Sequence, residues 1–227
     1  MSATLLSYEH GIHALDAEYV RPRLAASYLM VQNGHAAIIE TGTNRSVPRI
    51  LSELADLGIA PGAVDYVIVT HVHLDHAGAA GALLSACPNA RLVVHPKGAR
   101  HMIDPEKLIQ GSIAVYGEAP FRELYGDILP CPPARVIEAD DGFKLDFHGR
   151  MLTFVDTPGH ARHHFCVLDS ASNGFFTGDT FGISYREFDV AGRPFIFPTS
   201  TPVQFEPDAL HASIDRLMAM RPDAMYL

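Results

Sequence analysis

Four side chains that can bind metal ions fall close together in the segment VTHVHLDHAG, residues 69–78. They are His71, His73, Asp75 and His76. Burying polar groups this close together is costly unless each has a partner. On an extended chain His71 and His73 point to the same side, whereas the adjacent Asp75 and His76 are expected to point apart. Imidazole with carboxylate suits zinc, and also iron, manganese or nickel, so the spacing predicts a metal centre.

Two further candidate ligands each follow a glycine where a predicted strand ends. His160 lies in DTPGHARHH, and Asp179 lies in FFTGDT. Glycine lets a backbone approach closely, and loops at strand ends are the usual place for function on a rigid scaffold. If all six side chains converge, they form most of a dinuclear site in which Asp179 is the shared carboxylate.

Most of the other histidines are expected to be hydrogen-bonded or surface residues, because a single histidine at a strand end is seldom a ligand. These are His10, His13, His35, His95, His101, His148 and His211. His163 and His164 are less certain, since one of them is placed to orient a ligand or the substrate. We assign that role to His164.

The predicted ligands require strands that end beside them, and the sequence supplies two runs of strands. VDYVIVT, residues 64–70, is a nearly continuous apolar run, typical of a strand that is buried on both faces. Asn33-Gly34 is a strong turn signal and predicts a hairpin between residues 27–32 and 35–40. Further strands are expected at 4–10, 12–15, 91–96, 143–149, 150–160, 164–170, 174–179 and 224–227.

Helices are expected after each run of strands. Residues 47–58 have helical spacing and end in glycine, and residues 77–87 and 207–220 are also predicted to be helical. Residues 97–133 mix helix-like pieces with prolines, so we expect a partly helical insertion over one edge of the domain. Strands in two runs with helices after each imply an α/β sandwich of two sheets, back to back, with helices outside.

The charge balance argues against binding to nucleic acid or to an anionic membrane. The chain has 17 basic and 26 acidic residues, and both kinds of binding depend on clustered positive charge. Three widely separated cysteines predict reduced thiols and a cytoplasmic location. We find neither a signal peptide nor an apolar run near the roughly 18 residues of a membrane span. The expected partner is a small-molecule substrate, and a homo-oligomer is left open.

The segments THVHLDHAG, DTPGH and TGDT, in this order and with these gaps, resemble the metallo-β-lactamase fold superfamily, and IIETG resembles its first strand-end motif. The resemblance spans nearly the whole chain. Its motifs are highly specific for fold and metal site and poorly specific for substrate. It implies one domain, residues 1–227, with a four-layer αββα sandwich of two mixed β-sheets flanked by helices. Within the superfamily, the metal-dependent hydrolases of the glyoxalase II and lactonase type are the expected relatives.

The resemblance also implies roles for individual residues. His71, His73 and His160 would hold one metal ion, Asp75 and His76 would help to hold a second, and Asp179 would bridge the two. Glu40 stands where relatives usually have aspartate, and there the carboxylate would support a ligand by a hydrogen bond. The expected cofactors are two divalent metal ions, with zinc preferred and iron or manganese left open.

The predicted activity is attack by a metal-bound hydroxide on an ester, lactone or thioester carbonyl, with Asp75 binding metal and handling the proton. No protein nucleophile is then required, and the sequence offers no G-x-S-x-G elbow. The first alternative is a mononuclear iron thiol or persulfide dioxygenase of the same fold. A nuclease and a non-catalytic metal-binding module are weaker alternatives.

Aromatic side chains after Asp179 are the candidate substrate-binding residues. They belong to FGISY and to the loop at residues 188–205, and comprise Phe181, Tyr185, Phe195 and Phe197. Together they would form an apolar wall. For any one of them, ordinary core or loop packing is the slightly better interpretation.

The end of the sequence carries one more expectation. Relatives usually supply a late histidine just beyond a final short strand, and this sequence stops at AMYL. We therefore expect the encoded protein to continue beyond Leu227 to a histidine that completes the second metal site. If the functional chain ends there, Asp75, His76 and Asp179 would hold the second ion with water in the open position, and more weakly than the first.

Overall fold

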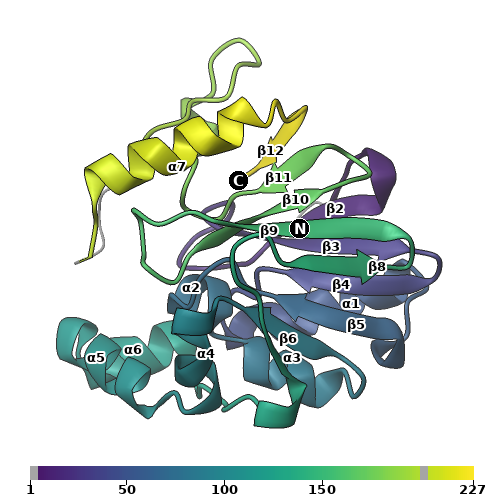
Figure 1. Ribbon diagram of the computed structural model, residues 1–227. Helices are drawn as coiled ribbons and strands as arrows, with labels where there is room; N and C mark the ends of the chain where they lie inside the picture. Colours follow the sequence, from purple (N-terminus) through teal and green to yellow (C-terminus); the bar gives the residue numbers. More distant parts are fainter. Residues whose placement is uncertain (1–4, 200–203) are drawn as a thin grey trace. The chain divides into compact units, whose positions relative to one another are not determined.

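The computed structural model describes residues 5–199 and 204–227, which form two compact units, Met1–Glu138 and Ala139–Leu227. Each unit contains one β-sheet with its own helices (Figure 1). The prediction of a single domain stays a prediction. In the described residues no helix combines the length and hydropathy needed to cross a membrane.

A seven-stranded sheet forms the frame of the first unit, in the order β1-β2-β3-β4-β5-β6-β7. Its strands are β1 (Leu6–Ser7), β2 (Ile12–Asp16), β3 (Ala26–Gln32), β4 (His35–Ile39), β5 (Val64–Ile68), β6 (Arg91–Val94) and β7 (Val136–Glu138). Strands β1 to β4 pair antiparallel, whereas β4 to β7 pair parallel, so the sheet is mixed. Because β4 and β5 are parallel, their C-terminal ends lie at the same edge of the sheet. The candidate ligands follow the C-terminal end of β5.

The predicted hairpin is confirmed. Strands β3 and β4 pair antiparallel from Tyr28–Ile39 to Gln32–His35, and the two residues between them are Asn33 and Gly34. Both turn residues are left-handed, with φ of 50° and 80°. Asparagine and glycine tolerate this conformation best, which is why the pair fixes the register.

Six α-helices lie in the described residues of the first unit. They are α1 (Val47–Asp56), α2 (Leu74–Ala77), α3 (Ala80–Ala86), α4 (Pro96–Ile103), α5 (Glu106–Tyr116) and α6 (Glu118–Tyr125). Ile50 and Leu54 of α1 and Leu83 of α3 are fully buried in one cluster with residues of β5 and β6. The helix expected over residues 77–87 is divided, because α2 ends at Ala77 and α3 begins at Ala80.

The segment between β6 and β7 contains α4, α5 and α6, where a partly helical insertion is expected. Helices α5 and α6 run side by side (Figure 1). The chain then returns through Arg135, whose guanidinium group donates to the backbone oxygens of Leu84, Cys87 and Ala90 at the end of α3. The Leu84 carbonyl lies in the last turn of α3, where the helix itself supplies no partner. These hydrogen bonds fix the point at which β7 joins the sheet.

The second unit is built on a five-stranded mixed sheet, in the order β12-β11-β10-β9-β8. Its elements are β8 (Lys144–Phe147), β9 (Arg150–Asp156), β10 (Phe165–Asp169), β11 (Gly174–Phe176), α7 (Pro207–Ala219) and β12 (Ala224–Tyr226). Only β11 and β12 pair parallel. Leu217 of α7 packs against Val155, Cys166 and Phe175, so the helix covers one face of this sheet. These elements agree with the predicted strands and helix.

A buried ion pair crosses the β9–β10 pair of the second unit. Arg150 Nε and Nη2 donate to the two carboxylate oxygens of Asp169, both at 2.6 Å, and both side chains are almost fully buried. Asp169 also accepts hydrogen bonds from the backbone nitrogens of Ala171 and Ser172. The carboxylate is thus satisfied on every side, as a buried charge must be.

The remaining short elements are 3-10 turns. They lie at Glu9–Gly11, Asn44–Ser46, Pro61–Ala63, Pro133–Arg135 and Arg186–Phe188. With helices on both mixed sheets, the predicted α/β fold class is confirmed.

Candidate metal centre

The motif of the first unit begins where β5 ends. His71 follows Ile68 by three residues and is fully buried. His73 is still extended, with φ of −65° and ψ of 144°, and it caps the start of α2. A strand end followed at once by a helical turn therefore brings four candidate ligands to one edge of the sheet.

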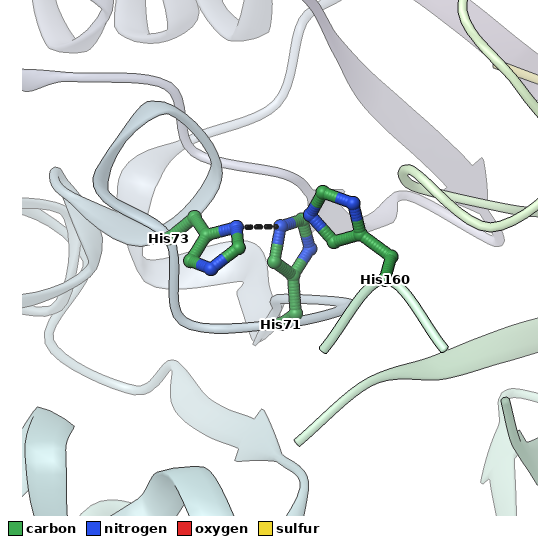
Figure 2. A group of neighbouring side chains, drawn as sticks. All are labelled: His71, His73 and His160. Carbon is green, nitrogen blue, oxygen red and sulfur yellow. Dashed lines mark hydrogen bonds between the residues drawn. The ribbon is translucent and has the colours of Figure 1, made fainter. Parts of the chain in front are cut away.

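His71 and His73 face each other through their ring nitrogens. His71 Nε2 and His73 Nδ1 are hydrogen-bonded at 2.9 Å, as Figure 2 shows. On the other side of its ring, His71 Nδ1 lies 3.0 Å from the Thr70 hydroxyl. The expected same-side orientation of the two imidazoles is therefore present. Their facing nitrogens are the atoms that a metal ion would take.

Glu40 fixes the orientation of His76. Its Oε2 accepts a hydrogen bond from His76 Nδ1 at 2.8 Å, and its Oε1 accepts one from the backbone nitrogen of Thr70 at 2.9 Å. An ionised carboxylate can only accept, so Nδ1 carries the proton and Nε2 keeps a lone pair. Glu40 is buried, 4% exposed, and its longer side chain reaches His76. Its role in supporting a metal ligand stays a prediction.

Asp75 and His76 do not point apart, and that expectation is wrong. His76 Nε2 lies 3.7 Å from Asp75 Oδ2. Strand alternation does not apply to them, because both lie in α2, where neighbouring side chains are about 100° apart around the helix axis. The lone pair of His76 thus faces a carboxylate oxygen across a gap that suits one cation.

The second unit holds the other two candidate ligands. His160 is buried, and its Nε2 lies 3.3 Å from Asp179 Oδ2. Gly159 has φ of 133°, and a Cβ there would come within 2.4 Å of the backbone of Leu210. Glycine is therefore required beside His160 for a close approach to α7, as the sequence suggested. His160 is drawn with the first-unit histidines in Figure 2.

His164 lies fully buried among hydroxyl groups. Its Nδ1 is 2.9 Å from Thr157 Oγ1 and 3.1 Å from Thr180 Oγ1. Thr180 directly follows Asp179, so His164 contacts the side chain of the residue next to that candidate ligand. This contact differs from the expected bond to a ligand side chain, and the supporting role of His164 stays a prediction.

Aromatic rings gather in the loop that follows Asp179. The ring centroids of Tyr185 and Phe197 lie 5.1 Å apart, and those of Phe195 and Phe197 lie 5.9 Å apart. Phe188, which the sequence pattern did not indicate, joins the group at 5.9 Å from Phe195 and is 54% exposed. Phe181 is half-buried, and no ring contact joins it to this group among the residues described.

The two arms of this loop are joined to each other, and one of them is bonded to Asp179. Ile183 and Phe197 exchange backbone hydrogen bonds, and the Thr199 hydroxyl donates to the backbone oxygen of Asp179 at 2.7 Å. The predicted loop continues to residue 205, but residues 200–203 lie outside the described residues. An aromatic hairpin is thus anchored at a candidate ligand.

The sequence pattern of the metallo-beta-lactamase superfamily matches residues 20–227, which is most of the chain. The chain belongs to the metallo-beta-lactamase superfamily. Members of this superfamily bind metal ions, and the histidine and aspartate groups described above are candidate positions for them.

A solved structure supports this assignment. The chain matches that of ST1585, an archaeal superfamily protein from Sulfolobus tokodaii, with a TM-score of 0.75 and 26% identity. The match covers 95% of this chain and 78% of the other. By sequence, ST1585 of Sulfurisphaera tokodaii is 28% identical over 85% of this chain and 68% of its own length. The predicted metallo-β-lactamase fold is therefore confirmed.

Two relatives with named activities are also similar. A hydroxyacylglutathione hydrolase of Aeromonas hydrophila is 28% identical over 87% of this chain and 58% of its own length. A thioesterase of Emericella nidulans, pkgB, is 30% identical over 67% of this chain and 34% of its own length. The chain thus spans about 58% of the length of the former and about a third of the latter. Both relatives are hydrolases by name.

The superfamily assignment gives the Glu40–His76 contact a measurable consequence. We expect Glu40→Ala to weaken metal binding by about 10- to 100-fold, because removing an outer hydrogen-bond partner of a ligand costs that much. Titration of the metal-free protein with zinc, followed by calorimetry, measures the change. Glu53→Gln is the matched control, since Glu53 pairs with Arg49 on α1 and is also largely buried. Equal zinc affinity in Glu40→Ala and the wild type would contradict this role.

Several of the remaining histidines have structural contacts, as expected. His95 Nδ1 accepts from the backbone nitrogen of Lys97 and caps α4, and His13 Nδ1 lies 3.0 Å from Ser7 Oγ. His35 Nδ1 lies 3.0 Å from Asp65 Oδ2 near the surface. These contacts require no metal ion.

Proposed function

We propose that this chain is a metal-dependent hydrolase that cleaves an ester, lactone or thioester carbonyl. In this proposal His71, His73 and His160 hold one divalent ion, Asp75 and His76 hold a second, and Asp179 bridges them. The observation that carries it is the buried Glu40 carboxylate, which turns the lone pair of His76 toward Asp75. Membership of the superfamily supports the proposal that residues of the first unit and residues of the second unit bind the same metal ions.

The donor atoms fit a divalent metal ion. In the first unit two ring nitrogens converge at 2.9 Å, and a third ring nitrogen faces a carboxylate oxygen at 3.7 Å. Nitrogen and carboxylate oxygen are ligands that zinc accepts, and iron and manganese accept them too. When bound, such an ion lowers the pKa of water and polarises a carbonyl group. We propose zinc as the resident metal.

Asp75 has two tasks in this proposal. One carboxylate oxygen faces His76 and binds metal, and the side chain remains about one-third exposed. That exposure leaves the other oxygen able to accept a proton from water and to pass it to the leaving group. In this proposal the second carboxylate oxygen of Asp75 carries the proton from water to the leaving group. The chain then needs no serine or cysteine nucleophile.

The loop after Asp179 favours an apolar, carbonyl-containing substrate over a phosphate. Its rings at Tyr185, Phe195 and Phe197 offer contact area, and one of its two arginines, Arg186, pairs with Asp189 at 3.4 Å. A phosphodiester would need cations that are free to bind it. The names of the relatives, a hydroxyacylglutathione hydrolase and a thioesterase, point to a thioester.

The proposal predicts a clear order of substrates. We expect the lactoyl and propionyl thioesters of glutathione, p-nitrophenyl acetate or a small lactone to be hydrolysed at least about tenfold faster than bis(p-nitrophenyl) phosphate, because the apolar loop gives the phosphate little stabilisation. Metal analysis of protein purified without added metal accompanies the panel. A phosphodiester as the best substrate would contradict the proposal. So would iron with oxygen uptake and no hydrolysis, which would indicate a dioxygenase.

A further inference from the structure

Tyr19 lies in a loop of the first unit that is folded tightly after β2. Asp16 ends β2, and its two carboxylate oxygens accept hydrogen bonds from the backbone nitrogens of Glu18 and Arg23, at 2.9 and 2.8 Å. A hydrogen bond from the backbone nitrogen of Ala17 to the backbone oxygen of Ala25 closes the base of the loop. One side chain thus clamps both arms of the loop that carries Tyr19.

The backbone on both sides of Tyr19 is strained. Glu18 and Val20 have φ of 55° and 58°, in the left-handed region that L-residues with a branched side chain avoid. This conformation is unfavourable for such residues, so the rest of the loop must hold each of them there. The result is that Val20 is 64% exposed while Tyr19 between them turns inward. Strain of this kind is concentrated at functional positions.

The Tyr19 ring meets Tyr125 at the end of α6. The two hydroxyl oxygens lie 3.0 Å apart, and the rings stack with centroids 6.0 Å apart. Tyr125 is buried in a cluster with Leu74, Phe121 and Ile128, against which Tyr19 also packs. Leu74 stands between His73 and Asp75 in the sequence. The phenol pair therefore packs on the helical turn that presents the candidate metal ligands.

The negative charge of Asp75 acts on both phenols. Burial raises the pKa of Tyr19, the hydrogen bond with Tyr125 lowers it in part, and the negative charge of Asp75 raises it further. Burial also raises the pKa of Tyr125, and Asp75 again contributes. Both hydroxyls are therefore protonated at neutral pH, so each has a hydrogen to donate.

One of these two hydrogens has no acceptor. Among the residues that the structure describes, the hydroxyls of Tyr19 and Tyr125 have only each other as hydrogen-bond partners. Tyr125 is the more deeply buried, and an unsatisfied buried donor is costly, so Tyr125 donates to the Tyr19 oxygen. The hydrogen of the Tyr19 hydroxyl, on the half-exposed side, is then left to donate elsewhere.

We propose that Tyr19 binds the substrate, with its hydroxyl donating a hydrogen bond to a substrate oxygen beside Asp75 while Tyr125 holds the phenol in position. This deepens the proposed function and rests on it. Tyr19 would make contact with the substrate itself, whereas Tyr125 acts only through Tyr19 and is a positioning residue.

The test compares Tyr19→Phe and Tyr125→Phe with the wild type on the two glutathione thioesters. Loss of one hydrogen bond predicts that kcat/KM falls about tenfold in Tyr19→Phe, and by a smaller factor in Tyr125→Phe. Metal content and Tm should stay at the wild-type values in both. Tyr116→Phe is the matched control, because Tyr116 is 50% exposed although its ring lies 6.1 Å from that of Tyr125.

A second readout does not depend on turnover. The chain has eight tyrosines and no tryptophan, so its near-ultraviolet absorption reports on phenols. Adding lactate, a product of one thioester, should perturb this absorption in the wild type and in Tyr116→Phe, and the perturbation should be absent in Tyr19→Phe. The proposal would be overturned if Tyr19→Phe had wild-type rates and if lactate changed its absorption as much as it changes that of the wild type. A loss of metal or a lower Tm that accounts for the defect of Tyr19→Phe would also overturn it.

The two proposals fail in different ways. If the wild type hydrolyses none of the carbonyl substrates, the proposed function is wrong, and the lactate titration still decides whether Tyr19 contacts a ligand. If the wild type hydrolyses the thioesters and Tyr19→Phe equals it in both readouts, only the role of Tyr19 is wrong.

Discussion

Replacing His71 by alanine is expected to remove the tightly held metal ion and to lower kcat/KM on the best thioester by more than about a hundredfold. Loss of an outer partner alone costs about 10- to 100-fold, and a direct ligand should cost more. His71 is fully buried, with its ring nitrogens toward His73 and Thr70, so solvent cannot easily take its place. Metal analysis and steady-state kinetics on the same preparation measure both effects.

The same loss is expected for His160→Ala and Asp179→Ala. Because these residues belong to the second unit, an equal loss of metal from either would mean that both units contribute to one centre. His211→Ala is the matched control, since His211 is exposed on α7. Full metal occupancy and full rate in His71→Ala, or in either second-unit variant, would remove the basis of the proposed centre.

Breaking the buried Arg150–Asp169 pair is expected to cost about 3–5 kcal/mol in the free energy of unfolding. In Arg150→Met the carboxylate of Asp169 stays buried and charged without its guanidinium partner, which is why the cost is so high. Denaturant unfolding measures it. The double variant Arg150→Met/Asp169→Leu should recover part of the loss, because it leaves no unpaired charge. A single variant within 1 kcal/mol of the wild type would contradict this account.

The same pair predicts a dependence on pH. Burial alone would raise the pKa of Asp169, but the hydrogen bonds and charge of Arg150 outweigh it and lower the pKa. A lowered folded-state pKa contributes stability above the ordinary carboxyl pKa of about 3.9, and that contribution is lost as the pH falls below this value. The difference in stability between the wild type and the double variant should therefore shrink at acid pH.

The parts of the fold that local sequence determines were predictable. Asn33-Gly34 fixes a turn by backbone conformation alone, and the apolar run after Val64 fixes a buried strand. The metal motif was visible for the same reason, since its residues lie next to one another in the sequence. Alternation failed only at Asp75, where the chain changes from an extended segment to a helical turn.

Features that depend on distant contacts were not predictable. Strand β7 has only three residues, none fully buried, and it is held by pairing with β6 and by Arg135 rather than by its own apolar pattern. Tyr19 and Tyr125 are 106 residues apart, and the sequence around either residue does not predict their contact. Phe188 was missed because its role depends on how the loop returns to Asp179, which tertiary contacts decide.

The connection between β6 and β7 is longer than the sheet requires. Two parallel strands need a crossover of about a dozen residues, and α4 with its flanking turns already supplies that length. Arg135 fixes the return of the chain to α3 whatever lies between. Mutations, insertions and deletions within α5, which has no fully buried residue, can therefore accumulate during evolution without disturbing the sheet or His71. Changes in α6, whose Tyr125 packs with Leu74 of the metal-binding motif, would alter which substrates are accepted if Tyr19 has the proposed role.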